Sequence, residues 1–328
     1  IKFIKNGKPI GLQKLANHVL KIANGKYMMR LDADDWMEEG ALLIMVKKLE
    51  ASKKAGLIYG NYYYANSEGR IIGIEMREAL NNEGSRNQLP PHGACTLFRT
   101  RALKSVGGYS EEVNAQDGWD LWYKLADRIG AISVRSPIFY YRQHDNSMSK
   151  DNEKLIAARS KIFEQAAEKL EGDYKPSTVA VIPVKESYPD FEGVPFQEVN
   201  GKSLLEIAIL SASTSKKIDS IIISSESKKV LNFSEKLEIN GKVPKHYRLL
   251  RKEKKISKGS QTVPIRDFMF LASEFYKDNE GSYPDIVIYL SLHAINRRAD
   301  HIDKALNVLR INESDSVVSV QEEREPMF

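Results

Sequence analysis

The amino-acid sequence predicts an α/β protein made of two successive α/β domains. Segments with apolar residues at helical spacing alternate with short, continuously apolar segments, which is the pattern of helices alternating with buried strands. The 328 residues are about twice the ~150 residues of a typical domain. Gly172 and Pro176 interrupt the chain near its middle, so we expect a domain boundary there.

In the first half, Leu12, Leu15, Val19 and Ile22 share one side of a helix predicted over residues 12–23. The elements predicted after it are a short buried strand at 26–31, a helix at 38–51 and a strand at 56–64. This alternation favours a layered structure around a largely parallel sheet.

The second half continues the alternation. We expect a first domain over residues 1–150, a helical linker over 151–176 and a second domain over 177–328. The predicted strands of the second domain lie at 179–184, 218–224, 285–290 and 316–320, with a helix over 204–212. Continuous apolar runs of this kind are typical of buried parallel strands.

Composition excludes several classes of protein. The 49 basic residues exceed the 44 acidic ones by only five, which is too few to indicate nucleic-acid binding. The single cysteine, Cys95, rules out a disulfide framework and a cysteine-rich zinc site. No apolar run reaches the ~18 residues of a spanning helix, and no signal peptide is recognisable. Because the sequence starts and stops in mid-pattern, we expect a fragment of a longer, cytoplasmic polypeptide, with peripheral attachment to the inner membrane face left open.

Three carboxylates, Asp32, Asp34 and Asp35, follow the first predicted strand. Ligands of open α/β sheets bind beyond such strand ends, and a divalent cation would compensate for the repulsion between the acids. Asp32 and Asp34 share one side because side chains alternate along a strand. The alternative is an acidic turn ahead of the next helix.

The surrounding string GLQKLANHVLKIANGKYMMRLDADDWM resembles the core of family 2 glycosyltransferases, which have the GT-A fold. The ordered landmarks are Gly11, Leu12, Asn17, Gly25 and residues 32–35. The resemblance implies that Asp32, Asp34 and Asn17 serve the nucleotide-sugar donor. It also implies that Asp34, with Asp32, holds Mn²⁺ or Mg²⁺.

A later string, HGACTLFRTRALKSVGGYSEEVNAQDGWDLWYKLA, also resembles this family. Gln116 and Asp117 stand where the family has a Glu-Asp pair, which implies that Asp117 is the general base for an acceptor hydroxyl. Asp120, one helical turn on, is a second candidate, and a helix N-cap is the structural alternative for Asp117. Trp119 and Trp122 are expected in the core more than against a sugar ring.

The strand-like segment before Arg142 leads into a loop that resembles the closing loop of the family. The resemblance implies that Arg142 and His144 reach the donor diphosphate. The alternative for His144 is a surface histidine beside Asp145. His92 matches the acceptor-side loop of the family only loosely. The resemblance covers residues 11–149, and the first strand of the family would precede Ile1.

The second domain, from VAVIPV onward, resembles the cytidylyltransferases that activate sialic acid and related acids, which have a doubly wound nucleotidyltransferase sheet. Lys185, Lys202 and Arg297 are the candidate nucleotide-binding residues. The loop over 185–193 has gained acids, which repel a triphosphate, and the later metal-binding acids of the family would follow Phe328. We read the basic run over 248–258 as a solvated loop.

The leading hypothesis is therefore an inverting, metal-dependent glycosyltransferase of surface polysaccharide synthesis. Its partners would be a nucleotide-diphosphate sugar and a glycan or lipid-linked acceptor, with no nucleic acid and with a homo-oligomer left open. One alternative is a cytidylyltransferase that activates an acidic sugar with CTP. Another makes the second domain a non-catalytic binding or assembly module.

Overall fold

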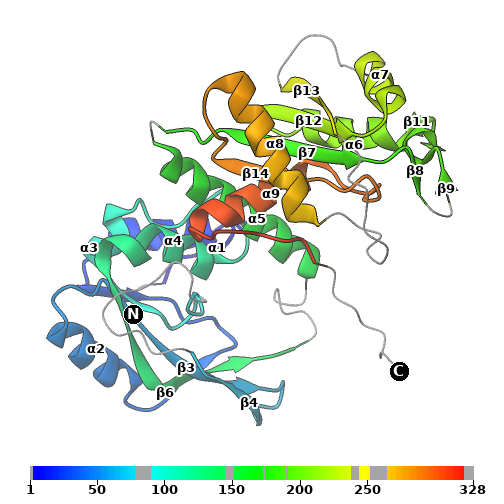
Figure 1. The fold of residues 1–328 in the computed structure, drawn as a ribbon. Coiled ribbons are helices and arrows are strands. Elements are labelled where there is room, and N and C mark those ends of the chain that lie inside the picture. Colours follow the sequence, from blue (N-terminus) through cyan, green and yellow to red (C-terminus); the bar gives the residue numbers. More distant parts are fainter. Residues whose placement is uncertain are drawn as a thin grey trace. The chain divides into compact units, whose positions relative to one another are not determined.

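The computed structural model describes residues 3–77, 90–144, 151–172, 174–188, 191–237, 244–251 and 264–320. The chain divides into two compact units. The first comprises Ile1–Leu170 with Arg310–Ser314, and the second comprises Glu171–Leu309 with Asp315–Phe328. Each unit has a sheet with helices packed on it (Figure 1). Among the helices that the structure describes, none is both long enough and apolar enough to cross a membrane.

The first unit contains both helices and short strands. In order these are α1 (Leu12–Ile22), β1 (Tyr27–Met29), β2 (Trp36–Met37), α2 (Ala41–Ala51), β3 (Leu57–Ala65), β4 (Ile71–Glu75), β5 (Leu97–Arg99), α3 (Thr100–Ser105), α4 (Asp117–Ile129), β6 (Ala131–Arg142) and α5 (Asn152–Glu171). The predicted helices at 12–23 and 38–51 and the strands at 26–31 and 56–64 are confirmed as α1, α2, β1 and β3.

The first sheet has the strand order β1-β5-β3-β6-β2, with β4 paired to β3. The prediction of a largely parallel sheet is wrong here, because β3 and β6 form the only parallel pair among the described strands of this sheet. A tight turn makes β4 run back along β3: the Asn66 N–H bonds the Arg70 carbonyl oxygen at 2.9 Å, and Gly69 has a φ of 85°. Hydrophobic spacing does not encode pairing direction.

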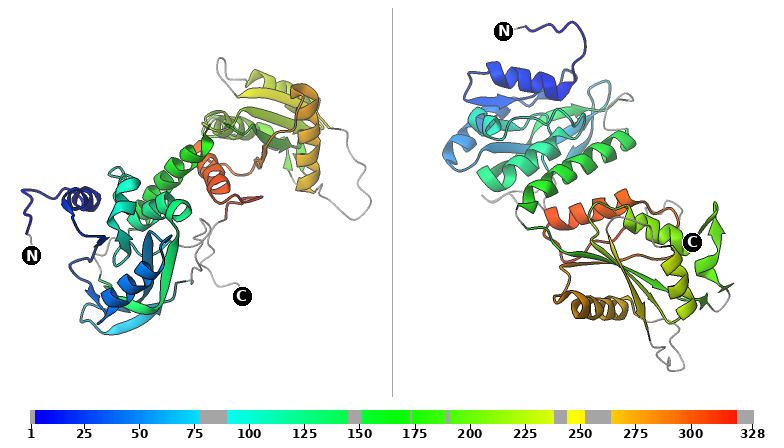
Figure 2. Two further views of the ribbon diagram at one scale, coloured as in Figure 1. Left: turned by 90° about the vertical axis from the view of Figure 1, so that its left-hand side faces the viewer. Right: turned by 90° about the horizontal axis from the view of Figure 1, so that it is seen from above.

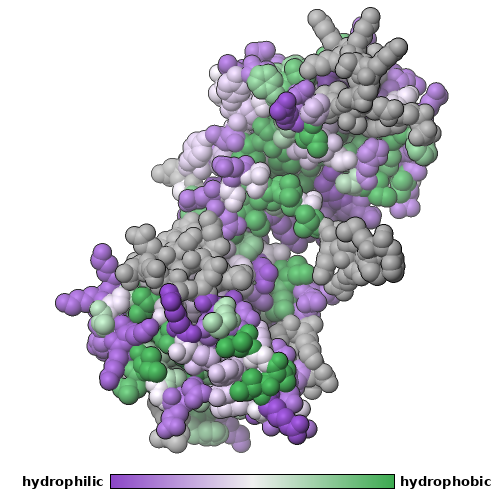
Figure 3. All heavy atoms as spheres, turned by 60° about the horizontal axis from the view of Figure 1, so that its bottom comes forward, coloured by the Kyte–Doolittle hydropathy of each residue, from purple (hydrophilic) through white to green (hydrophobic). Residues whose placement is uncertain are grey.

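Helices cover both faces of the first sheet (Figure 1). Along β3, Leu57 and Tyr59 pack with residues of α1, α3 and α4, whereas Ile58 and Tyr62 face residues of α2. Trp122 is fully buried in the first of these layers, as expected. Some apolar side chains are exposed, including several on α2 and β4. Figure 3 shows apolar patches among hydrophilic side chains on one face of the molecule.

Helix α5 falls in the segment expected as a linker, yet it packs on the first unit. Ala158 and Ile162 of α5 share a buried cluster with Val113 and Ala115, and Phe163 packs against the same cluster. This contact supports the end of α4 that carries Asp117.

The second unit begins at a buried strand. Its elements are β7 (Thr178–Val184), β8 (Ser187–Tyr188), β9 (Phe191–Glu192), η2 (Val194–Phe196), β10 (Glu198–Val199), β11 (Lys202–Ser203), α6 (Leu204–Ser213), β12 (Ser220–Ser225), α7 (Lys228–Lys236), β13 (Lys245–Leu250), α8 (Ile265–Glu280), β14 (Ile286–Tyr289) and α9 (Ala299–Ile311).

The main sheet of this unit is parallel and covered on both faces. Its strand order is β13-β12-β7-β14, with every pairing parallel. Ala180 and Ile182 pack with residues of α6, α7 and α9, while Val179 and Val181 pack with residues of α8. Figure 2 shows α8 on the opposite side of this sheet from α6 and α7. The doubly wound prediction is confirmed.

One predicted strand is absent from this unit. Residues 316–320 have no secondary structure, and Val318 and Val320 are 80% and 88% exposed. No strand pairs with this segment in the described part of either sheet. An apolar run becomes a strand only where a neighbouring backbone completes its hydrogen bonds, so the run alone was a poor guide.

Candidate active site

The acidic run after β1 lies beside the end of β6. Two contacts bring them together, because β2 pairs with β6 at Trp36 and Tyr140 and the two rings stack with centroids 4.8 Å apart. Arg142, the last residue of β6, lies over the Trp36 ring at 4.8 Å. Two segments far apart in the sequence therefore form one wall.

Three residues predicted to serve the donor meet at this wall. The Oδ2 atom of Asp34 lies 3.1 Å from His144 Nε2, and Arg142 Nε donates to the backbone oxygen of Asp34 at 2.9 Å. Asp34 and His144 are both partly exposed, with side-chain exposures of 42% and 37%. A ligand can therefore reach a carboxylate, an imidazole and a guanidinium from solvent. Residues 145–149 of the predicted closing loop lie outside the described residues.

Asp35 anchors the acidic run from inside. Its Oδ1 atom accepts from the Arg142 backbone N–H at 2.9 Å, while its Oδ2 atom is buried with no partner in the described part of the chain. Burial, together with the neighbouring charges of Asp34 and Asp32, raises the pKa of Asp35 to about 6. We therefore expect a structural carboxyl here, held in place by β6.

Arg30 connects the acidic run to the predicted base. Its Nε atom forms an ion pair with Asp32 Oδ1 at 2.9 Å, and its Nη1 atom donates to Asp117 Oδ2 at 2.8 Å. The side chain is only 13% exposed. Burial raises the pKa of Asp32, while the Arg30 charge lowers it. The sequence analysis did not single out Arg30, although a cation two residues before an acidic strand end was a visible signal.

Asp117 is held as the first residue of α4. The N-cap is Gln116 in a left-handed conformation, with a φ of 60°, so the N-cap alternative for Asp117 is wrong. The Gln116 side chain instead accepts from Arg159 Nη2 at 3.1 Å, and Arg159 lies over Trp119 at 4.5 Å. Helix α5 therefore fixes the turn that presents Asp117.

A tight loop covers the Asp117 carboxylate. A Cβ atom at Gly93 would lie 2.4 Å from Asp117 Oδ2, and one at Gly118 would lie 2.6 Å from the Pro91 carbonyl oxygen. Only glycine permits this approach at both positions. Between Pro91 and Gly93, the His92 ring packs among aromatic rings of β3 and β6, and burial lowers its pKa to about 4.

Asp120, the second candidate base, is occupied by structural bonds. Its carboxylate accepts from the N–H and hydroxyl of Ser110 at 2.9 and 2.7 Å and from Lys124 Nζ at 2.8 Å. The residue is only 5% exposed. Asp117 is also buried, at 8% exposed, but its described side-chain partner is Arg30 alone, whereas Asp120 has three hydrogen bonds within the fold.

Asn17 also has a structural position. Its side chain donates to the Tyr109 carbonyl oxygen and accepts from the Tyr109 N–H, both at 2.9 Å. A Cβ atom at Gly108 would lie 2.5 Å from Asn17 Oδ1. The structure does not bring Asn17 into contact with the acidic run; it ties α1 to the loop that leads to α4.

The described residues offer a small number of metal ligands. Within these ranges, no group of three or more His, Cys, Asp or Glu side chains could hold a metal ion. Asp34 supplies a carboxylate and His144 an imidazole 3.1 Å from it, whereas Asp32, the other predicted ligand, is paired with Arg30. Magnesium sites for nucleotides commonly use one or two carboxylates, completed by water and substrate phosphates. The Asp34 carboxylate therefore suits an ion shared with a diphosphate.

The candidate residues of the second unit, Lys185, Lys202 and Arg297, lie in three different segments of the chain. Lys185 follows β7 and Lys202 lies on β11, whereas Arg297 bonds Ser211 Oγ and the Ser291 carbonyl oxygen at 3.2 and 2.9 Å. Residues 189–190 of the acidic loop and 252–258 of the basic run lie outside the described residues.

Acidic and basic groups pair with each other at the carboxyl edge of the second sheet. Glu186 accepts from Ser227 Oγ at 2.5 Å and from Lys229 Nζ at 3.1 Å. Arg251, directly after β13, pairs with Glu226 at 2.8 Å. Ligands of such sheets bind at this edge, and here the charges of Lys229 and Arg251 are balanced by protein carboxylates.

One family model matches the first third of the chain. Residues 1–107 match the model described as "Glycosyl transferase family 2", which confirms the predicted family for that segment. The chain is 24% identical over 145 residues to a chondroitin synthase from Pasteurella multocida, a stretch that covers 43% of this chain and 15% of that protein. It thus spans about one seventh of that relative. Asp117, Arg142 and His144 lie outside the matched segment.

Two solved structures share weaker similarity. The crystal structure of S. aureus TarS 1-349 is 17% identical, with a TM-score of 0.36, and the match covers 49% of this chain and 45% of that one. A CMP:2-keto-3-deoxy-manno-octonic acid synthetase complexed with CTP is 15% identical, with a TM-score of 0.32 and coverages of 42% and 48%.

Proposed function

We propose that the first unit is an inverting glycosyltransferase that moves a sugar from a nucleotide-diphosphate donor to a hydroxyl of a glycan or lipid-linked acceptor. Surface polysaccharide synthesis would be its setting. One observation carries the proposal: Arg30 joins Asp117 to Asp32. The base candidate and the donor-side acids are thereby held in one site, although they come from separate motifs.

The donor would bind at the wall formed by Asp34, Arg142 and His144. Asp34 and His144 would hold Mn²⁺ or Mg²⁺, and such an ion supplies Lewis-acid stabilisation of the leaving diphosphate. The guanidinium of Arg142 offsets further negative charge on the diphosphate oxygens. Both side chains that would hold the ion are partly exposed, so the donor can enter from solvent.

Asp117 would act on the acceptor. The acceptor hydroxyl oxygen forms a bond to the anomeric carbon as the bond from that carbon to the diphosphate breaks. The hydroxyl proton passes to the Asp117 carboxylate, and the nucleoside diphosphate leaves with the electron pair. Attack opposite the leaving group inverts the anomeric carbon. Arg30, 2.8 Å from Asp117 Oδ2, orients the carboxylate.

The test is a donor screen on the full-length protein with Mn²⁺, following nucleoside diphosphate release. We expect transfer to be lost in Asp34→Ala and in Asp117→Ala. Glu68→Ala removes an acid that is 64% exposed and paired only with Arg70 in the described residues, so this control should keep full activity. Undiminished transfer by both site variants, with folded protein confirmed by circular dichroism, would contradict these roles.

For the second unit, the paired edge of its sheet favours a binding or assembly module over a cytidylyltransferase. Glu186 and Glu226 neutralise Lys229 and Arg251, and a triphosphate would have to displace these carboxylates. Calorimetry separates the two functions. We expect no heat of binding with CTP and Mg²⁺, whereas saturable binding with pyrophosphate release from CTP and a sugar acid would establish the cytidylyltransferase.

A further inference from the structure

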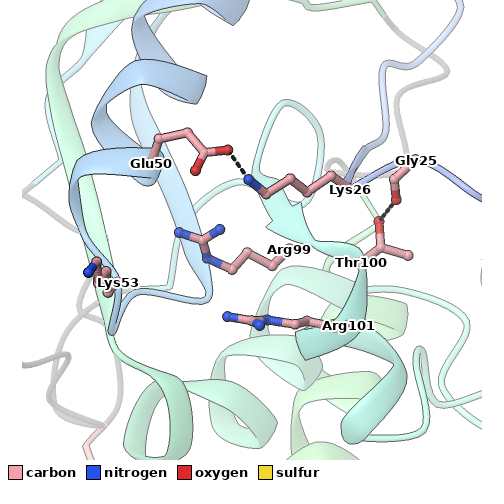
Figure 4. Close-up of a pocket in the computed structure, with 7 residues that line it drawn as sticks. All are labelled: Gly25, Lys26, Glu50, Lys53, Arg99, Thr100 and Arg101. Atoms are coloured by element: carbon pink, nitrogen blue, oxygen red, sulfur yellow. Dashed lines mark hydrogen bonds and ion pairs between the residues drawn. The ribbon is translucent and has the colours of Figure 1, made fainter.

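A basic pocket lies at the other end of β1 from the acidic run. Lys26 directly precedes β1, whereas Asp32 follows it. The pocket has a volume of about 530 Å³ and is lined by Gly25, Lys26, Glu50, Lys53, Arg99, Thr100 and Arg101 (Figure 4). It combines the start of β1, the end of α2 and the junction of β5 with α3. None of the residues assigned above to donor, metal or acceptor lines it.

The pocket carries a fixed positive charge. Arg99 is 7% exposed and donates to backbone oxygens of the α2 end and the following turn, namely those of Leu49, Ser52 and Ala55, at 2.6, 3.1 and 2.9 Å. Carbonyl oxygens satisfy its hydrogen bonds but do not cancel its charge. Because the group is buried and rigidly held, its positive potential in the pocket is screened less than that of a surface lysine.

Two further cations are free to bind an incoming anion. Lys53 and Arg101 are exposed, and neither makes a hydrogen bond or ion pair within the part of the chain that the structure describes. Figure 4 shows the Arg99 and Arg101 side chains extending in the same direction, toward the side of the pocket where Lys53 lies. Glu50 is the only carboxylate of the lining, and it is already bonded to Lys26 and to the Tyr27 hydroxyl.

The walls of the pocket are held in place by the sheet. Tyr27 pairs with Arg99 in the β1–β5 ladder. The Thr100 hydroxyl donates to the Gly25 carbonyl oxygen at 2.7 Å. The Thr100 N–H donates to the Lys26 carbonyl oxygen at 3.0 Å. The cations therefore surround a preformed hollow, which reduces the entropy lost on binding.

We propose that this pocket binds a phosphate-bearing ligand at a site distinct from that of the sugar donor. Four cations against one carboxylate leave a net charge of +3 (four minus one) on the lining, which suits a ligand with two or more negative charges. The guanidinium of Arg101 offers the planar donor pair that matches phosphate oxygens. The phosphate could belong to a soluble diphosphate or to a lipid headgroup, and the experiment distinguishes them.

The first measurement is calorimetric titration of the full-length protein with inorganic pyrophosphate. EDTA is included so that no metal recruits the anion to Asp34. We expect saturable binding that is weakened at least tenfold in the double variant Lys53→Gln/Arg101→Gln. The matched control, Lys47→Gln/Lys48→Gln, removes the same charge from exposed positions of α2 outside the pocket and should change affinity less than twofold.

The second measurement is sedimentation with vesicles of phosphatidylglycerol or of phosphatidylcholine. Binding to phosphatidylglycerol that pyrophosphate displaces, and that only the pocket variant loses, supports the proposal with a headgroup as the source. Pyrophosphate binding without vesicle binding supports it with a soluble ligand. The proposal is overturned if the affinity for pyrophosphate falls equally in both double variants, or if neither pyrophosphate nor vesicles bind.

Discussion

The substitution Asp117→Asn tests the assigned base most directly. The amide keeps the size of the side chain but cannot accept the acceptor proton. General-base catalysis contributes about 10²- to 10⁴-fold, so kcat should fall by that factor, which is about 3–5 kcal/mol of barrier. The loss of unfolding free energy is limited, because Arg30 keeps its ion pair with Asp32 at 2.9 Å. Loss of one charged hydrogen bond costs about 1.5–3 kcal/mol of unfolding free energy.

Asp120→Asn is the matched control, since it makes the same chemical change one helical turn later. Asp120 holds Ser110 and Lys124, so its amide variant should lose about 3 kcal/mol of unfolding free energy while the folded fraction keeps its kcat. The assay is nucleoside diphosphate release at saturating donor, with thermal unfolding measured in parallel. The assignment fails if Asp117→Asn retains kcat within threefold, or if Asp120→Asn loses kcat as severely while folded.

Three further outcomes follow from the same geometry. Gly93→Ala places a Cβ atom 2.4 Å from Asp117 Oδ2, so it should lower kcat at least tenfold while the circular dichroism spectrum stays that of a folded protein. An unchanged kcat would show that the loop moves aside without displacing the Asp117 carboxylate. Asp34→Asn and His144→Gln should each weaken Mn²⁺-dependent binding of a nucleoside diphosphate at least tenfold by calorimetry, and equal binding with and without Mn²⁺ in the wild type would contradict the metal role. The pKa of Asp35 is raised to about 6, so the folded state holds this proton more tightly than the unfolded state does. Its contribution to stability is present below about pH 4 and is lost as the pH rises through about 6, by about 3 kcal/mol. Asp35→Asn has no carboxyl to ionise, so it should gain free energy of unfolding relative to the wild type between about pH 4 and about pH 7. Urea unfolding measures this, and a difference between the two proteins that does not change with pH would refute the raised pKa.

The sequence predicted the elements better than their pairing. Apolar spacing located α1, but the buried face of this helix is formed by Gln13, Ala16 and Leu20, while Val19 and Ile22 are exposed. Spacing sets the period of a helix, whereas the neighbouring elements decide which side is covered. The same limit explains the antiparallel pairs of the first sheet and the missing strand at 316–320.

Some of the predicted site residues lie together in the structure, although their roles stay predictions. Asp34, Arg142 and His144 were named from two separate motifs and meet in the structure. Asn17 was named from motif order alone, and its amide is used within the fold. The sequence showed Arg30 as a cation close to the acidic run, but its ion pair with Asp117 could not be read from one strand, because only folding brings these two residues together.

The Arg30 bridge has a consequence for how donor and acceptor sites are coupled. Asp32 and Asp117 share one buried cation, so a change of charge at either carboxylate alters the field at the other. If the donor brought a cation close to Asp32, that cation would compete with Arg30 for the carboxylate. Under the proposed mechanism, Arg30 would then be held more by Asp117, with which it already forms a 2.8 Å ion pair. Arg30 would thereby couple the proposed donor site to the orientation of the proposed base.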